Sequence, residues 1–209
     1  MTSVFSAIQN KAPTPSTAAP LLGTVAHTLT AMRGVWHDHV EVYDLAGRPL
    51  TEDLLAGSPG SAPFDNLVYI DFDGERWIQT NVTFRGRPLS AKTFSGRLVD
   101  GVLQFDSLGP EAPRHMGTGA GPGTLFLNAY QVTDSWTRYL EPDVVTLLSP
   151  NERTRVTLLY RDGKAVRTLR AHGTRLAPSA HKRLDWDPRG ADGEVHERPM
   201  VTNAYQGQQ

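Results

Sequence analysis

The pattern of apolar and polar positions changes its period once along this chain of 209 residues. Between residues 21 and 33, apolar side chains recur at spacings of three and four, which predicts one short amphipathic helix. From Trp36 onward, apolar and polar positions alternate, as they do in strands that bury one face. Gly34 lies at the change and is expected to end the helix, because glycine tolerates the left-handed backbone at a helix C-terminus.

Asp-Gly pairs at 73–74, 100–101 and 162–163 each separate two strand-like runs and predict β-hairpins. This dipeptide suits a type I′ turn, in which both central residues need positive φ. Two further strands are expected within 125–133 and 138–149. Together with the strand that begins at Trp36, the pattern predicts about nine antiparallel strands in sequential order.

No predicted helix is long enough for a crossover between parallel strands. So many sequential strands would leave exposed edges unless the sheet closes on itself. We therefore expect an all-β protein with a closed up-and-down antiparallel barrel of about 8–10 strands and a short N-terminal helix. A β-sandwich is the second interpretation.

Proline and glycine mark the regions outside the strands. Residues 1–20 are expected to be a flexible N-terminal arm, residues 21–177 the barrel domain, and residues 178–209 a polar C-terminal tail. The glycine- and proline-rich segments 50–65 and 109–123 are expected to be long loops within the domain.

Composition excludes several classes of function. Lys and Arg number 21 against 22 Asp and Glu, so the net charge is −1 and no phosphate-binding surface is indicated. The absence of cysteine excludes disulfides, thiolate metal sites and cysteine nucleophiles. No apolar run approaches the ~20 residues of a membrane span, and the first residues lack a signal-peptide pattern. A cytoplasmic protein without nucleic-acid or membrane partners is expected, and its oligomeric state is left open, with a homodimer as one option.

Familiar catalytic motifs are also missing. There is no Gly-x-Ser-x-Gly elbow, and the seven histidines do not lie beside a candidate nucleophile. The glycine-rich run 117–123 lacks the Lys-Ser/Thr that completes a phosphate-binding loop. Neither triad hydrolysis nor nucleotide binding is predicted.

The residues Gly34-Val35-Trp36, between the predicted helix and the first strand, resemble the Gly-x-Trp opening of lipocalins and their calycin relatives. Arg167, Arg170 and Arg175 resemble the late arginine that packs over this tryptophan in the family, and the sequence leaves open which one does so. The resemblance covers residues 21–176. Because cysteine is absent, it points to intracellular bacterial members, and because His37-Asp38-His39 follows the tryptophan, the pattern of haem-binding barrels is not met. No cofactor is expected.

This resemblance implies a barrel that encloses one small, largely apolar ligand. Some bacterial barrels similar to this are cyclases of natural-product pathways, which fold a polyene for intramolecular cycloaddition. Holding the diene and dienophile close removes an entropy cost, and a hydrogen bond to the activating carbonyl adds stabilisation. The resemblance therefore favours a cofactor-free cyclase or isomerase for a hydrophobic polyketide-like intermediate, including Diels–Alder-type ring closure. A non-catalytic carrier of a small apolar ligand is the alternative.

Polar residues and aromatic residues of the predicted strands supply the candidate site. Asp38 shares a strand face with Trp36 and Val40, where an unpaired buried carboxylate would be costly. It is expected either to pair with a basic residue of the closing strand or to lie at a pocket with a shifted pKa. The candidate catalytic residues are Asp38, Gln79 and Tyr130. The candidate ligand-binding residues are Trp36, Tyr69, Trp77, Asn128 and Trp136.

A third interpretation concerns His37, His39 and Glu41, which alternate along the first strand and so share one face. Two imidazoles and a carboxylate could bind one metal, as in the His-x-His of cupin-type enzymes. If Trp36 and Val40 face inward, however, these three side chains face solvent. No metal ligand is assigned on this basis.

Overall fold

The computed structural model describes most of the expected domain. The described residues are 23–53, 60–84, 88–106, 114–131, 141–161 and 163–177. The expected arm and tail and the candidate Trp136 lie outside these residues, so those expectations remain predictions.

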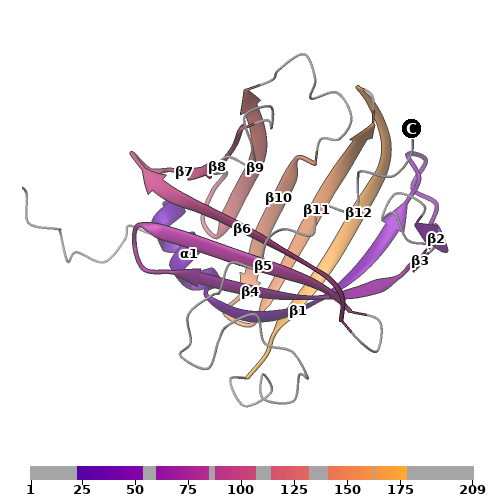
Figure 1. Cartoon of the computed structure of the whole chain (residues 1–209), viewed down its shortest axis with the longest axis horizontal. Helices are drawn as coiled ribbons and strands as arrows, with labels where there is room; N and C mark the ends of the chain where they lie inside the picture. The colour runs from indigo at the N-terminus through magenta and orange to yellow at the C-terminus, as the bar shows by residue number, and fades with distance from the viewer. Residues whose placement is uncertain are drawn as a thin grey trace, which may run out of the picture.

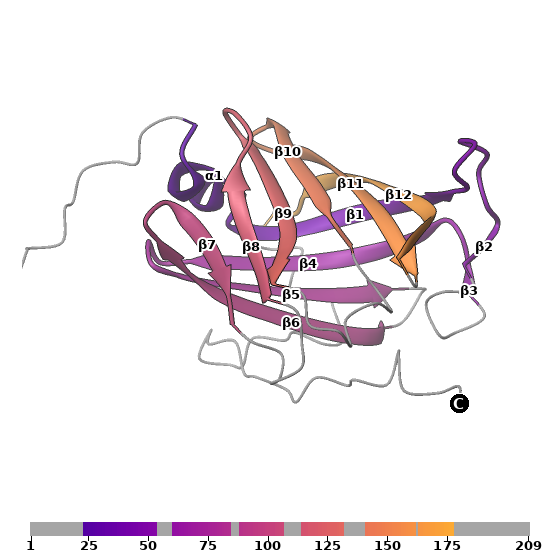
Figure 2. The same cartoon turned by 90° about the horizontal axis from the view of Figure 1, so that it is seen from above.

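Ten antiparallel strands form one closed barrel (Figures 1 and 2). From β4 onward each strand pairs with the next in sequence, and β1 closes the ring by pairing with both β4 and β12. The predicted up-and-down barrel of 8–10 strands is therefore confirmed. The barrel strands are β1 (Gly34–Tyr43), β4 (Phe64–Phe72), β5 (Arg76–Phe84), β6 (Pro88–Val99), β7 (Val102–Phe105), β8 (Arg114–Gly119), β9 (Thr124–Gln131), β10 (Asp143–Ser149), β11 (Glu152–Arg161) and β12 (Lys164–Arg175).

The helix α1 (Val25–Met32) covers one end of the barrel, and the short strands β2 (Glu52–Asp53) and β3 (Gly60–Ser61) pair at the other (Figures 1 and 2). Thr24 begins the helix, because its side chain accepts a hydrogen bond from the His27 backbone N–H at 3.2 Å. The helix ends just before Gly34, whose φ is +119°. The predicted helix is thus confirmed with shorter bounds.

The Asp-Gly turns are not all of one type. At the β6–β7 turn, Asp100 and Gly101 have φ of 49° and 79°, as a type I′ turn requires. At the β4–β5 turn only Gly74 has positive φ, and the Asp73 side chain instead accepts hydrogen bonds from backbone N–H groups of the turn. The third predicted hairpin is formed by β11 and β12, although Asp162 lies outside the described residues.

The expectation that 109–123 is a loop is wrong for its centre, because β8 runs through it as a barrel strand. The backbone of β8 pairs with β7 on one side and β9 on the other. A Cβ at Gly117 would lie 2.8 Å from Cδ2 of Leu127, so a larger residue there would require the leucine side chain to move. Glycine gives β8 little strand propensity of its own, so neighbouring strands determine its conformation. Likewise β2 and β3 fall within the expected loop 50–65.

Side chains of β1 alternate as predicted: Trp36, Asp38, Val40 and Val42 are buried, and the residues between them are more exposed from His37 onward. The main core lies inside the barrel against α1. Its buried members are Val25, Leu29, Met32, Trp36, Val68, Ile70, Phe72, Trp77, Leu103, Leu125 and Val145. A smaller cluster lies on the opposite face of β1, β4 and β5 and contains Val35, Leu67, Tyr69 and Val82, with Leu176 against it.

Candidate functional site

The end of the barrel beneath α1 is filled by Trp36, which has no exposed surface. Its indole Nε1 donates a hydrogen bond to the Met32 carbonyl at 2.8 Å, joining β1 to the last turn of the helix. The Arg175 guanidinium lies 4.2 Å from the centre of the indole ring and donates to the carbonyls of Ala31 and Arg33. Arg175 is therefore the late arginine that the sequence left open.

Gly34 explains the first position of the Gly-x-Trp motif. A Cβ at Gly34 would lie 2.8 Å from Nη1 of Arg175, so a larger residue would displace the guanidinium from Trp36. Burial lowers the pKa of Arg175, and the nearby charge of Arg153 lowers it further. The arginine nevertheless satisfies carbonyls at the helix C-terminus, where positive charge is favoured.

Asp38 is 1% exposed and forms an ion pair with Arg153 inside the barrel. Arg153 Nη2 lies 2.8 Å from Oδ2 and 2.9 Å from Oδ1, and its Nε lies 3.1 Å from Oδ1. Pairing with a basic residue was one of the two expectations for Asp38. The partner, however, belongs to β11 and not to the closing strand β12.

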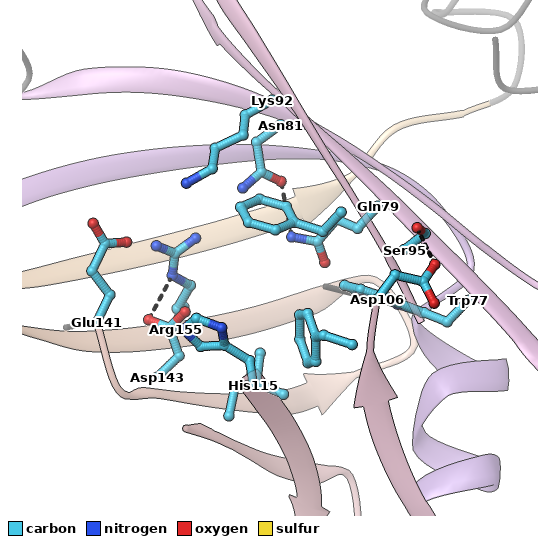
Figure 3. Close-up of a pocket in the computed structure, with 13 residues that line it drawn as sticks. Trp77, Gln79, Asn81, Lys92, Ser95, Asp106, His115, Glu141, Asp143 and Arg155 are labelled. Atoms are coloured by element: carbon cyan, nitrogen blue, oxygen red, sulfur yellow. Dashed lines mark hydrogen bonds and ion pairs between the residues drawn. The ribbon is translucent and has the colours of Figure 1, made fainter. Parts of the chain in front are cut away.

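Beyond this closed end, the barrel contains a cavity of about 240 Å³ (Figure 3). It lies between the wall formed by β5, β6 and β7 and the wall formed by β8 to β11. The lining residues are Trp77, Gln79, Asn81, Lys92, Phe94, Ser95, Phe105, Asp106, His115, Leu127, Glu141, Asp143 and Arg155. A smaller space of about 30 Å³, roughly the volume of one water, lies deeper toward α1.

Aromatic rings form one part of the lining. Trp77 and Phe105 meet edge to face, with centroids 5.1 Å apart and an interplanar angle of 63°. The His115 ring lies 6.0 Å from Phe105, which continues the aromatic surface onto β8. Such a surface suits a flat or apolar ligand body.

Two amides form a polar patch on β5. Gln79 Nε2 donates to Asn81 Oδ1 at 2.9 Å, since alternate residues of the strand face the cavity together. This bond leaves the Gln79 carbonyl oxygen as an acceptor and the Asn81 amide nitrogen as a donor. The pair can therefore accept from one polar group of a ligand and donate to another.

Arg155, Asp143 and Thr157 form a hydrogen-bonded group on the facing wall. Arg155 Nε donates to Asp143 Oδ1 at 3.2 Å and to Thr157 Oγ1 at 3.0 Å, and the Thr157 hydroxyl donates to Asp143. The Asp143 carboxylate raises the pKa of Arg155, with further contributions from Glu141 and Asp38. The guanidinium therefore stays charged within the cavity wall.

Among the candidate residues whose side chains the structure describes, it brings Gln79 and Trp77 to the cavity. Asp38 is held in its ion pair, and Trp36 is part of the core beneath the helix. Tyr69 belongs to the cluster on the opposite sheet face, and Asn128 follows the cavity-lining Leu127 and so faces away. These four residues therefore lie outside the cavity lining, and for Asp38 the ion pair is one of the two arrangements expected from the sequence. Tyr130 lies on β9, but its side chain is outside the described part, as is Trp136.

Sequence reasoning missed most of the polar lining. Arg153, Arg155 and Thr157 alternate along β11, so three polar side chains share the inward face of one strand. That period-two polar pattern is the signal that could have identified β11 as part of the site.

His37 and His39 face outward, with side chains 47% and 52% exposed. Both rings approach the same oxygen of Asp65, at 3.3 Å and 3.0 Å. Within the described ranges, no group of three or more histidine and acidic side chains is arranged to hold a metal ion. The prediction of a solvated strand face is thus confirmed by their exposure.

Comparison with known proteins gives structural matches only. No family model matches the sequence, and no curated protein matches it. A protein of unknown function from the DUF3598 family of Nostoc punctiforme superposes with a TM-score of 0.55 and 16% identity over 71% of this chain and 49% of that one. The chain thus spans about half the length of that protein. The S-type phycobiliprotein lyase from Guillardia theta superposes with a TM-score of 0.52 and 13% identity, over 74% of this chain and 93% of the lyase.

In the portion of the chain that the structure describes, no helix has the length and apolar character needed to cross a membrane.

Several observations agree on the fold. They are the Gly-x-Trp opening, the arginine stacked on its tryptophan, the closed barrel and these structural matches. The chain has a lipocalin-like, calycin-type β-barrel fold.

Proposed function

We propose that the barrel binds one small molecule with an apolar body and a carbonyl group, and promotes its isomerisation or ring closure without a cofactor. One observation carries the proposal: the cavity places the aromatic rings of Trp77 and Phe105 in the same space as the amide pair of Gln79 and Asn81. Rings can hold the ligand body in one shape, and amides can orient its polar group.

The chemistry needs little more than this arrangement. An intramolecular cycloaddition makes and breaks bonds within one molecule, so no external acid, base or leaving group is required. Confinement holds the reacting carbons in contact, which can lower the barrier by several kcal/mol. A hydrogen bond from the Asn81 amide to the activating carbonyl would stabilise charge that develops during bond formation.

The volume of the cavity limits the substrate. About 240 Å³ equals the share of roughly eight water molecules in the liquid, which accommodates one or two rings. A longer polyketide-like chain would extend past Lys92 and Asp106, whose exposure places them toward the mouth.

The test looks for the conversion of a small molecule into an isomer of the same mass. The purified protein is incubated with small-molecule extract of its source cells, and the mixture is separated by liquid chromatography with mass detection. We expect one component to decrease while an isomer of identical mass but different retention time increases. Asn81→Phe, which fills the cavity, should abolish the conversion, and Gln104→Phe on an exposed position of β7 should not. Conversion that survives Asn81→Phe would contradict the proposal.

A carrier function is the second candidate, because one observation favours it. Asp38 and Asp143, two carboxylates inside the barrel, each accept hydrogen bonds from an arginine and are poorly placed to act as bases. This disfavours an isomerisation that begins with proton abstraction, although it does not bear on a ring closure that needs no base. A carrier should release its molecule unchanged and in a one-to-one ratio. Native mass spectrometry gives the ratio of ligand to protein, and chromatography of the released molecule, which separates isomers of identical mass, distinguishes the two candidates.

A further inference from the structure

We propose that the cavity recognises a carboxylate on its ligand, held by Arg155 with Lys92 and Asn81. This inference rests on the proposed ligand-binding function and adds the chemical class of the ligand. The ligand would be an apolar monocarboxylate whose body lies against the aromatic rings. Hydrogen-bond donors of the cavity wall that have no partner among the described residues support this inference.

Arg155 uses only part of its hydrogen-bonding capacity. A guanidinium has five N–H donors in a planar fork, and the bonds of Arg155 to Asp143 and Thr157 both come from Nε. Within the described residues its terminal nitrogens have no hydrogen-bond partner. Figure 3 shows these nitrogens directed into the cavity, away from Asp143. A fork held through Nε and open at its terminal nitrogens suits bidentate binding of a carboxylate.

Two further donors point into the same space. Lys92 lies on β6 directly opposite Asn81 of β5, so both side chains face the cavity. The ammonium of Lys92 lies 4.7 Å from the centre of the Phe94 ring and has no carboxylate partner among the described residues. Figure 3 shows the Lys92 ammonium and the Asn81 nitrogen on the side of the cavity that the Arg155 fork faces.

The acidic groups of the lining do not offer an equivalent site for a cation. Asp106 accepts from Ser95 at 2.5 Å and lies 3.0 Å from the Arg76 guanidinium. Asp143 is occupied by Arg155 and Thr157. Glu141 raises the pKa of Arg155 and has an interaction of its own. An incoming cation would therefore compete with existing partners, whereas an incoming carboxylate would meet open donors.

The test compares two probes of nearly the same shape, one with a carboxylate and one with a neutral amide. 2-Naphthoate and 2-naphthamide share a ring system of a size that fits the cavity, and each places one carbonyl group at the same position. Binding to the full chain is measured by titration calorimetry and by quenching of tryptophan fluorescence, because Trp77 lines the cavity. We expect the naphthoate to bind roughly tenfold more tightly or better, since hydrogen bonds to charged groups exceed neutral ones.

Three variants locate the effect. Lys92→Met replaces the ammonium with an apolar group of similar length, and should weaken naphthoate binding several-fold and naphthamide binding much less, because the lost group is a positive charge. Arg155→Lys keeps the charge but loses the fork, and should reduce the preference for naphthoate further. Lys164→Met, at an exposed position of β12 away from the cavity, removes the same charge as a matched control and should change neither affinity.

The outcomes distinguish failure of the carboxylate inference from failure of the proposed ligand-binding function. Equal binding of both probes by the unaltered protein would overturn the carboxylate inference and leave the apolar cavity in place. A preference for naphthoate that Lys164→Met reduces as much as Lys92→Met does would also overturn it, because surface charge would then be the cause. Failure of both probes to bind would overturn the proposed ligand-binding function as well.

Discussion

Asp38 and Arg153 form a buried ion pair that spans the strand between them. They are 115 residues apart in sequence and lie on β1 and β11, which are separated by β12. In the sheet register both lie opposite Gly173 of β12. A Cβ at Gly173 would lie 2.3 Å from Asp38 Oδ1 and 2.8 Å from Arg153 Cγ, so glycine leaves the space that the pair occupies.

Breaking this pair should destabilise the protein strongly. Asp38→Asn or Arg153→Met leaves the remaining charge buried without its partner, which costs about 3–5 kcal/mol in comparable sites. We expect each single variant to lower the free energy of unfolding in urea by about this amount. The double variant should lose less than the sum of the two, because neither charge then remains alone.

An exposed contact between side chains provides the control. His39→Asn removes the contact with Asp65, in which the His39 side chain is 52% exposed, and should change stability by less than about 1 kcal/mol. Equal losses for the buried and exposed pairs would contradict the role assigned to Asp38 and Arg153.

Replacing Gly173 tests whether the ion pair needs the space that this glycine leaves on β12. Gly173→Ala should cost about 1–3 kcal/mol, because the added methyl group collides with the ion pair. Gly119→Ala is a matched control on β8, since the nearest atoms to its Cβ lie 3.5 Å and 3.8 Å away. Thermal and urea unfolding of both variants give the comparison. Similar losses at the two positions would show that the ion pair is not the cause.

Arg175 should stabilise α1 through its planar group and not only through its charge. Arg175→Lys loses the several hydrogen bonds to Ala31, Arg33 and Pro150 and the contact with Trp36, which predicts a loss of about 1–3 kcal/mol. In Arg175→Lys, amide hydrogen exchange should be faster than in the unaltered protein, and the increase should be larger in α1 than in the barrel strands. Arg170→Lys, exposed on the same strand, should leave exchange in the helix unchanged.

The β4–β5 turn should weaken at low pH. The Glu75 and Arg76 backbone N–H groups donate to the Asp73 carboxylate at 2.9 Å and 2.7 Å and hold the pKa of Asp73 below its ordinary 3.8. Because the folded pKa is the lower one, this stabilisation is present above pH 3.8 and is lost as the pH falls through the folded pKa. A carbon NMR titration of the carboxyl group should report the lowered pKa directly.

Asp73→Asn provides the second readout. It keeps an acceptor oxygen but has no titrating group, so the urea midpoint should fall less for this variant than for the unaltered protein between about pH 5 and about pH 2. Identical curves for the two proteins would contradict a contribution from Asp73.

The local parts of the fold could be predicted from the sequence. Alternation along β1 placed Trp36, Asp38 and Val40 on one face and the histidines on the other, because side chains of a strand point to opposite sides in turn. Asp100-Gly101 specified its turn, since few other residues accept positive φ twice. The number of strands then favoured closure into a barrel.

Other features depended on contacts between distant strands. Asp38 stood out as a carboxylate on an apolar face, yet its partner is on β11 and not on the closing strand, because Gly173 lets the arginine reach across β12. Tyr69 was expected to bind a ligand, but its position in the alternation of β4 places its side chain on the sheet face opposite the barrel interior. Among the three late arginines, only the register of β12 decided that Arg175 meets Trp36.

The sequence by itself determined a succession of antiparallel strands with a helix before the first one, because those features follow from periodicity and turn chemistry within short segments, and it favoured closure into a barrel over a sandwich. Only the tertiary structure decided that β8 is a strand, that Arg155 faces a cavity and that Lys92 and Asn81 face it as well. These depend on strand register, and register is determined by the packing of the whole barrel.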